Sequence, residues 1–76
     1  MTLRELLIKS HFDNNITIVL WKYNDSMKRW EISQKILGNN VNYIDFSDLD
    51  KYDVEYYSLY YTTVIYFHIY VKKRYE

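Results

Sequence analysis

Residues 54–71 read VEYYSLYYTTVIYFHIYV, and this stretch carries the clearest strand signal in the chain. Two runs rich in β-branched and aromatic residues flank a central Thr-Thr pair, which predicts two strands, 54–61 and 64–71, joined by a tight connection. Proline would confine a strand to the edge of a sheet, and the chain contains none. Either strand can therefore be central.

The second strand separates two kinds of side chain, because successive residues of a strand point to opposite faces of the sheet. Tyr66, His68 and Tyr70 share one face. The other face is apolar and consists of Ile65, Phe67, Ile69 and Val71. We expect the apolar face to pack in the core and the Tyr-His-Tyr face to point to the opposite side of the sheet.

The length of the connection decides which residues of the first strand join the Tyr-His-Tyr face. A three-residue connection adds Tyr56 and Tyr60 to it and places Leu59 in the core, whereas a two-residue connection reverses the two sets. We favour three residues, because Thr-Thr lacks the Gly and Asn typical of two-residue hairpin turns. In either case at least four tyrosines surround His68, and one short helix cannot cover both faces of a sheet.

The N-terminal half begins with a predicted helix over residues 3–10. Thr2 followed by Glu5 matches a capping box, and three leucines follow at helical spacing. Residues 16–23 are β-branched and apolar on both faces, as in a central strand. Residues 28–33 alternate as its hairpin partner. A hairpin closed at Asp25-Ser26 aligns two pairs on one face, which we expect to be core: Trp21 with Trp30, and Val19 with Ile32.

The middle of the chain has a weaker pattern. It predicts a single helical turn at residues 34–37, stopped by Gly38, and a weak strand at 41–46. A second short turn is expected between Ser47 and Asp50. Together the elements predict one domain over residues 1–76, of the α+β class, with the N-terminal helix packed on one face of an antiparallel sheet of about four strands.

The formal charge of the chain cancels, with ten basic and ten acidic residues. A general phosphate-binding protein would show a basic surplus, and a protein that imitates DNA by bulk charge would be strongly acidic. Locally the charge is uneven, because acidic residues crowd the segment 45–55. This segment is either a solvated loop or a group that occupies a groove meant for phosphates, through Asp45, Asp48, Asp50 and Asp53.

No catalytic constellation is recognisable, and we predict a protein that is not an enzyme and uses no metal or cofactor. His11 with Asp13 is too small a ligand set for a metal site. The single glycine excludes a Gly-rich phosphate loop. His68 is expected to pack within the sheet, with a neighbouring tyrosine as its hydrogen-bond partner.

The chain is expected to act in the cytosol of a bacterial host, away from the membrane. A membrane helix needs about 20 apolar residues, and the longest apolar run of the chain, 64–71, is far shorter. Charged residues interrupt the N-terminal apolar stretch, so no signal peptide is visible. The absence of cysteine agrees with a cytosolic location.

Three uses of the tyrosine face stay open. Tyrosine is enriched where proteins bind one another, so Tyr56, Tyr60, Tyr66, His68 and Tyr70 are candidate partner-binding residues. The same face would serve as the contact of a homodimer. Stacking of single-stranded nucleic acid is less favoured, because it needs cations along the backbone and only three residues at the C-terminus are placed to supply them: Lys72, Lys73 and Arg74.

The two ends of the chain resemble a diffuse set of small proteins from phages and prophages of low-GC Gram-positive bacteria. The resembling motifs are the opening MTLRELL, the DNNITIV entry into the first strand and the closing FHIYV. Such small phage proteins include inhibitors of host defence, anti-CRISPR proteins among them, which cover a surface of their target. The resemblance implies a phage or mobile-element inhibitor of a host protein, such as a CRISPR nuclease, that acts by steric occlusion.

Overall fold

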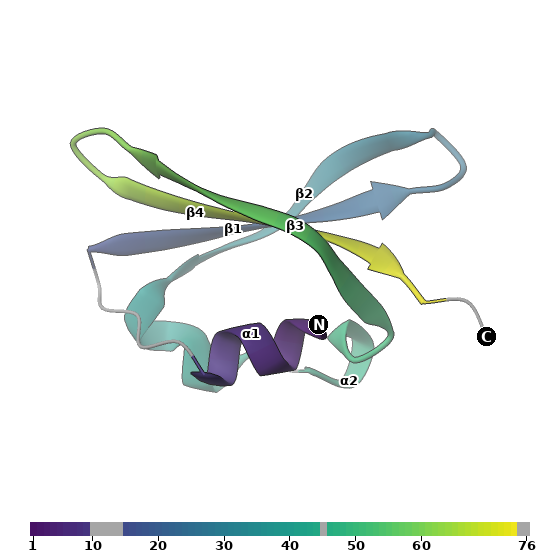
Figure 1. Ribbon diagram of the computed structural model, residues 1–76, viewed down its shortest axis with the longest axis horizontal. Helices are drawn as coiled ribbons and strands as arrows, with labels where there is room; N and C mark the ends of the chain where they lie inside the picture. Colours follow the sequence, from purple (N-terminus) through teal and green to yellow (C-terminus); the bar gives the residue numbers. More distant parts are fainter. Residues whose placement is uncertain (10–14, 45, 75–76) are drawn as a thin grey trace.

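The computed structural model describes residues 1–9, 15–44 and 46–74. In these ranges three helical segments lie on one side of a four-stranded sheet (Figure 1). In chain order the elements are α1 (Leu3–Lys9), β1 (Ile16–Asn24), β2 (Arg29–Leu37), the 3-10 helix η1 (Gly38–Tyr43), α2 (Phe46–Leu49), β3 (Tyr52–Tyr61) and β4 (Ile65–Lys73). The predicted α+β class and the four strands are confirmed.

Helix α1 begins where the sequence predicted it. The hydroxyl of Thr2 accepts a hydrogen bond from the backbone N–H of Glu5 at 3.2 Å, which satisfies one of the unpaired donors of the first turn. The same hydroxyl lies 3.2 Å from the Glu5 carboxylate. The N-cap prediction is therefore confirmed.

The sheet has the order β2-β1-β4-β3 and is mixed. Pairs β1–β2 and β3–β4 are antiparallel hairpins, but the two central strands, β1 and β4, run parallel. The predicted antiparallel sheet is therefore wrong at its centre. Tight turns impose antiparallel pairing only on neighbours in sequence, and the path from β1 to β4 through β2, η1, α2 and β3 is long enough to return the chain to the same end of the sheet.

The β3–β4 hairpin has the predicted three-residue connection, since Tyr61 pairs with Ile65. The hydroxyl of Thr62 bonds the backbone of Val64 in both directions, which holds the connection without glycine. In this register Tyr60 lies opposite Tyr66, so the predicted composition of the Tyr-His-Tyr face is confirmed. A β-bulge near the start of β3 shifts the register between Val54 and Tyr56.

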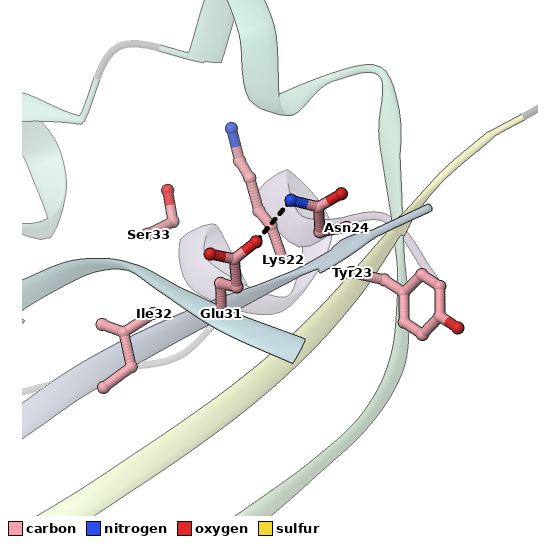
Figure 2. Close-up of a pocket in the computed structure, with 6 residues that line it drawn as sticks. All are labelled: Lys22, Tyr23, Asn24, Glu31, Ile32 and Ser33. Atoms are coloured by element: carbon pink, nitrogen blue, oxygen red, sulfur yellow. Dashed lines mark hydrogen bonds between the residues drawn. The ribbon is translucent and has the colours of Figure 1, made fainter. Parts of the chain in front are cut away.

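The β1–β2 hairpin has a longer turn than predicted. Asn24 pairs with Arg29, so four residues form the turn, and Tyr23 rather than Trp21 lies opposite Trp30. The side chain of Asn24 holds this turn by accepting a hydrogen bond from the N–H of Met27 at 3.1 Å. Across the strands the Asn24 amide also donates to the Glu31 carboxylate (Figure 2).

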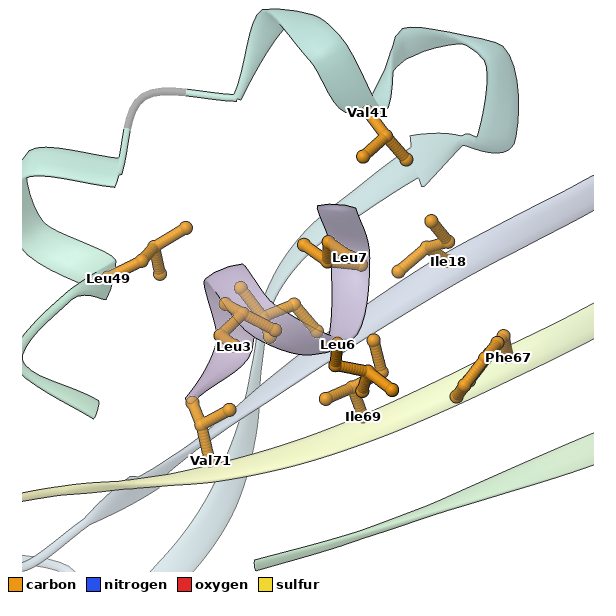
Figure 3. Close-up of a cluster of buried hydrophobic side chains, with 10 residues drawn as sticks. Leu3, Leu6, Leu7, Ile18, Val41, Leu49, Phe67, Ile69 and Val71 are labelled. Carbon is orange, nitrogen blue, oxygen red and sulfur yellow. The ribbon is translucent and has the colours of Figure 1, made fainter. Parts of the chain in front are cut away.

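One buried hydrophobic cluster lies on the helical side of the sheet (Figure 3). It combines leucines of α1, alternate residues of the two central strands, and one residue each from η1 and α2. Its members are Leu3, Leu6, Leu7, Ile18, Leu20, Val41, Leu49, Phe67, Ile69 and Val71. The apolar face predicted for the last strand therefore supplies three residues of this core, and Ile65, predicted with them, is half-buried outside the cluster.

The predicted core face of the first hairpin is correct only for Val19, which is buried, whereas Trp21 and Trp30 are half-buried and Ile32 is 47% exposed. Because Ile18 and Leu20 belong to the cluster, the alternation of β1 directs Val19 and Trp21 to the other face. Strand β1 is apolar on both faces, so its sequence does not say which face meets the helix. Leu59 was also expected in the core, but it is 47% exposed and stands outside the cluster.

The middle of the chain differs from the prediction. Strand β2 continues to Leu37, where a helical turn was expected, and the weak strand predicted at 41–46 is replaced by η1 and the start of α2. The short turn expected from Ser47 is present as α2. Val41 of η1 and Leu49 of α2 are buried in the hydrophobic cluster, and single anchors of this kind leave no periodic pattern in the sequence.

Candidate aromatic binding surface

The face of the sheet away from α1 carries a continuous layer of rings, which we call the aromatic face. All four strands contribute, because each directs alternate residues to that side. The pairing register brings the contributing positions into line across the sheet. The aromatic face consists of Trp21 and Tyr23 of β1, Trp30 of β2, Tyr56 and Tyr60 of β3, and Tyr66, His68 and Tyr70 of β4.

Tyr70 lies at the centre of this layer. Its ring is stacked on Tyr56, with centroids 4.3 Å apart and an interplanar angle of 18°, and on Trp21 at 5.5 Å and 13°. Trp30 meets it edge to face at 5.3 Å and 84°. Offset-stacked and edge-to-face contacts are the favoured arrangements of aromatic pairs. Burial raises the pKa of the Tyr70 hydroxyl, with a smaller contribution from the neighbouring Tyr56.

Trp30 extends the layer toward the β2 edge. It contacts Tyr23 edge to face at 5.2 Å and Tyr56 at 6.1 Å, so the ring contacts continue from one edge strand to the other. Neither tryptophan was predicted as a site residue. The sequence signal was present, since Trp21 and Trp30 were placed on one face, but the parallel register that joins this face to β4 is not visible in the sequence.

His68 takes its hydrogen bond from Trp21, not from the tyrosine that we expected. The indole Nε1 donates to the imidazole Nδ1 at 3.0 Å, so in the neutral ring the proton is on Nε2. His68 also lines an open hollow of about 230 Å³ together with Val19, Ile32, Lys35 and Tyr66. The hollow is thus lined by two aliphatic side chains together with the lysine, the tyrosine and the imidazole.

The five predicted sheet residues thus share one surface. Tyr56 and Tyr60 are exposed, while Tyr66, His68 and Tyr70 are half-buried by their neighbours. Among the described residues no helix covers this surface, because α1, η1 and α2 lie on the other side of the sheet (Figure 1). The rings are therefore ordered by one another and still accessible to a partner.

Two lysines belong to the same surface. The Lys72 ammonium lies 4.5 Å from the centroid of the Tyr23 ring, in cation–π geometry, and Lys35 lines the hollow beside His68. Only Lys72 was considered at the sequence level. The position of Lys35 opposite Val19 depends on a β-bulge between Leu20 and Trp21, which the sequence pattern does not reveal.

The acidic segment does not extend the aromatic face. Asp50 accepts two hydrogen bonds from the Arg4 guanidinium, at 2.7 and 3.0 Å, and so lies beside α1. Asp53 accepts hydrogen bonds from Arg74. These bonds lower the pKa of both carboxyl groups. Asp48 belongs to α2, and Asp45 falls outside the described residues.

A second hollow, of about 330 Å³, lies beside the β1–β2 hairpin (Figure 2). Three of its polar side chains contact one another or a neighbouring ring. The Asn24 amide donates to Glu31, and the Lys22 ammonium lies 4.7 Å from the centroid of the Tyr52 ring. We assign no ligand to it.

The described residues hold no group of three or more His, Cys, Asp or Glu side chains placed to bind a metal ion. The weak pair of His11 and Asp13 falls outside this part of the chain. No helix in the described ranges is long and apolar enough to cross a membrane.

Comparison of the chain with protein-family models, with curated proteins and with solved structures finds no match. The candidate function therefore rests on the aromatic face itself.

Proposed function

We propose that this is a non-catalytic binding protein that occupies a surface of a partner protein with its aromatic face. The proposal takes α1 to be packed on the opposite face of the sheet, as the sequence predicted. The observation that supports it is the layer of mutually stacked, accessible rings that crosses all four strands. An exposed apolar patch of this kind on a small protein marks an interaction site.

The composition and order of the surface favour a protein partner. Tyrosine and tryptophan are the residues most enriched at binding hot spots. Because Tyr70, Tyr56 and the two tryptophans already hold one another, little side-chain freedom is lost when a partner covers them. The hollow beside His68 offers a place for one apolar side chain of the partner, with the imidazole and Lys35 beside it.

The most specific form of the proposal is a phage or mobile-element inhibitor that blocks a host defence protein, such as a CRISPR nuclease, by steric occlusion. The resemblance at the two ends of the chain supports this form. The acidic segment has a smaller part in it than the sequence suggested, because Asp50 and Asp53 are already paired with arginines.

The second candidate function is stacking of single-stranded nucleic acid. It is favoured by Lys35 and Lys72, which place positive charge beside the rings, as a stacking surface for a phosphate backbone requires. The neutral total charge of the chain weighs against it.

The test uses two ring deletions on the aromatic face, Tyr60→Ala and Tyr66→Ala, and a matched control, Tyr43→Ala, which removes an 85% exposed tyrosine from η1. Each protein is titrated into DNA-cleavage assays with a panel of CRISPR nucleases from low-GC Gram-positive hosts. We expect inhibition by the wild type and the control, and a loss of about tenfold or more for the ring deletions. Equal inhibition by all four proteins would exclude the aromatic face as the binding surface.

The nucleic-acid candidate is tested with the same four proteins, the variant Lys72→Gln and a fluorescent single-stranded oligonucleotide. Stacking predicts binding that weakens steeply with salt and that both ring deletions and Lys72→Gln reduce. Absence of binding at low salt removes this candidate and leaves the protein-binding proposal unaffected.

A further inference from the structure

Among the described residues, strand β3 leaves most of its outer edge unpaired. The sheet order places β3 and β2 at the two edges. The first residues of β3 are covered by the N-terminus, since the N–H of Val54 donates to the carbonyl of Met1 at 3.0 Å and Thr2 bridges to Asp53. From residue 56 to 61 no other strand of the described chain pairs with that edge. Every second residue there directs its backbone N–H and C=O outward.

The two edges of the sheet differ in their protection. Strand β2 carries Arg29, Glu31 and Lys35, and charges along an edge oppose pairing with another strand. The open part of β3 reads YYSLYY and carries no charge, no proline and no bulge. Its large side chains are exposed on both faces, by 47–69%: Tyr56, Tyr57, Leu59, Tyr60 and Tyr61. An uncharged, apolar edge of this kind is a template for another strand.

We propose that β3 pairs antiparallel with β3 of a second copy of this chain, so that two sheets join into one. We consider antiparallel pairing about a two-fold axis perpendicular to the sheet, which keeps the aromatic faces of both copies on the same side. Over this segment such pairing has two registers, in which either Ser58 or Leu59 lies opposite the same residue of the second copy. Centring on Ser58 sets Tyr56 opposite Tyr60 of the second copy, and centring on Leu59 sets Tyr57 opposite Tyr61. Both registers create aromatic cross-strand pairs, the stabilising unit of a sheet.

The second copy is the occupant that the segment itself favours. In each of the two registers a tyrosine of one copy lies opposite a tyrosine of the other, and the two-fold axis repeats this pair. Because residues 56–61 carry no charge, a second copy brings no like charges face to face. The pairing also accounts for Tyr57, Leu59 and Tyr61, which lie on the helical side of the sheet and yet remain exposed.

The inference is independent of the proposed function. It uses the edge of β3 and leaves Trp21, Trp30, Tyr66 and His68 on an open surface. In the joined sheet the two aromatic faces lie side by side on the same side, so the dimer presents a binding surface of twice the length.

The first test measures mass in solution against concentration, by sedimentation or light scattering, for the wild type and for Leu59→Lys. Leu59 points away from the aromatic face, so a lysine there places a charge on the edge without touching the proposed binding surface. The matched control is Gln34→Lys, the same charge on an exposed residue of the β2 edge. We expect dimers for the wild type and the control, and a folded monomer for Leu59→Lys.

A wild type that stays monomeric at all accessible concentrations would overturn the inference. So would a dimer that survives Leu59→Lys and is lost in Tyr66→Ala, since that result assigns the contact to the aromatic face. A monomeric Leu59→Lys protein that still inhibits a nuclease separates the two proposals, because dimer contact and partner binding then depend on different residues.

The second test does not depend on how a lysine is tolerated. The chain has no cysteine, so single-cysteine variants cross-link only through the introduced residue. We expect Ser58→Cys or Leu59→Cys to form a disulfide-linked dimer under mild oxidation, because the residue on the two-fold axis faces its own copy within disulfide range. Gln34→Cys is the control. Failure of both β3 variants, or equal cross-linking of the control, contradicts the inference.

Discussion

Removing the central ring of the aromatic face should cost stability as well as binding. Tyr70→Ala deletes the three closest ring contacts of this side chain, with Trp21, Trp30 and Tyr56. Aromatic pairs contribute about 0.5–1.5 kcal/mol each beyond the area they bury. Three pairs give roughly 1.5–4.5 kcal/mol, and because these rings are open to solvent on one side we expect a loss of about 2–3 kcal/mol.

The loss is large for a domain of this size but leaves it folded. A chain of 76 residues has a free energy of unfolding of roughly 4–11 kcal/mol. At about 4–8 °C per kcal/mol for a domain this small, the melting temperature should fall by about 10–20 °C. Tyr70→Phe keeps all three ring contacts and should lie within about 0.5 kcal/mol of the wild type.

The assay is urea unfolding followed by far-UV circular dichroism, which reports the backbone and not the altered surroundings of Trp21 and Trp30. All proteins are compared at one concentration, because self-association shifts apparent stability. Tyr60→Ala, at a 63% exposed position, provides the reference for a ring at the margin of the layer, with an expected cost below about 1 kcal/mol. If Tyr70→Ala costs less than about 0.5 kcal/mol, the stacked layer does not exist in solution and the reasoning fails.

Three further measurements follow from individual contacts. Arg4 lowers the pKa of Asp50 in the folded state, so this pair stabilises the fold when the pH is above 3.8, the ordinary pKa of the carboxyl group. This stabilisation is lost as the pH falls through the lowered pKa. Acid unfolding of Asp50→Asn should therefore depend less on pH over that range than acid unfolding of the wild type. Burial raises the pKa of Tyr70 above 10.0, so the fold favours the neutral hydroxyl and stability declines as the pH rises through the raised pKa. In a titration followed by phenolate absorbance, Tyr70→Phe should therefore differ from the wild type, by one ionisable tyrosine, only at the alkaline end. Lys28 has a φ of 53°, a left-handed conformation that costs a non-glycine residue about 1 kcal/mol. Lys28→Gly should therefore raise the midpoint of urea unfolding. An unchanged or lower midpoint would count against this turn conformation.

The local features of this fold were predictable because each depends on a few neighbouring residues. The Thr2–Glu5 cap places the start of α1, and the poor two-residue turn chemistry of Thr-Thr implied the three-residue connection that the β3–β4 hairpin has. That connection fixes the register of the hairpin, and the register places Tyr56, Tyr60, Tyr66 and Tyr70 on one face of the sheet. These positions follow from alternation alone.

The features that the sequence did not reveal depend on contacts between distant segments. The turn after β1 takes four residues because the side chain of Asn24 bonds Met27, which moves Trp30 opposite Tyr23. Strand β1 is apolar on both faces, so only its parallel pairing with β4 assigns Trp21 to the aromatic face and Ile18 to the core.

The charges show the same division. The sequence shows an acidic segment, but its carboxylates are engaged only when folding brings Arg4 to Asp50 and Arg74 to Asp53. The sequence by itself determined the two hairpins, the capped helix and the alternation of tyrosine with aliphatic residues, because these are set by backbone geometry over a few residues. Only the tertiary structure decided that β1 lies parallel beside β4, and this one pairing joins two separate aromatic patterns into a single surface.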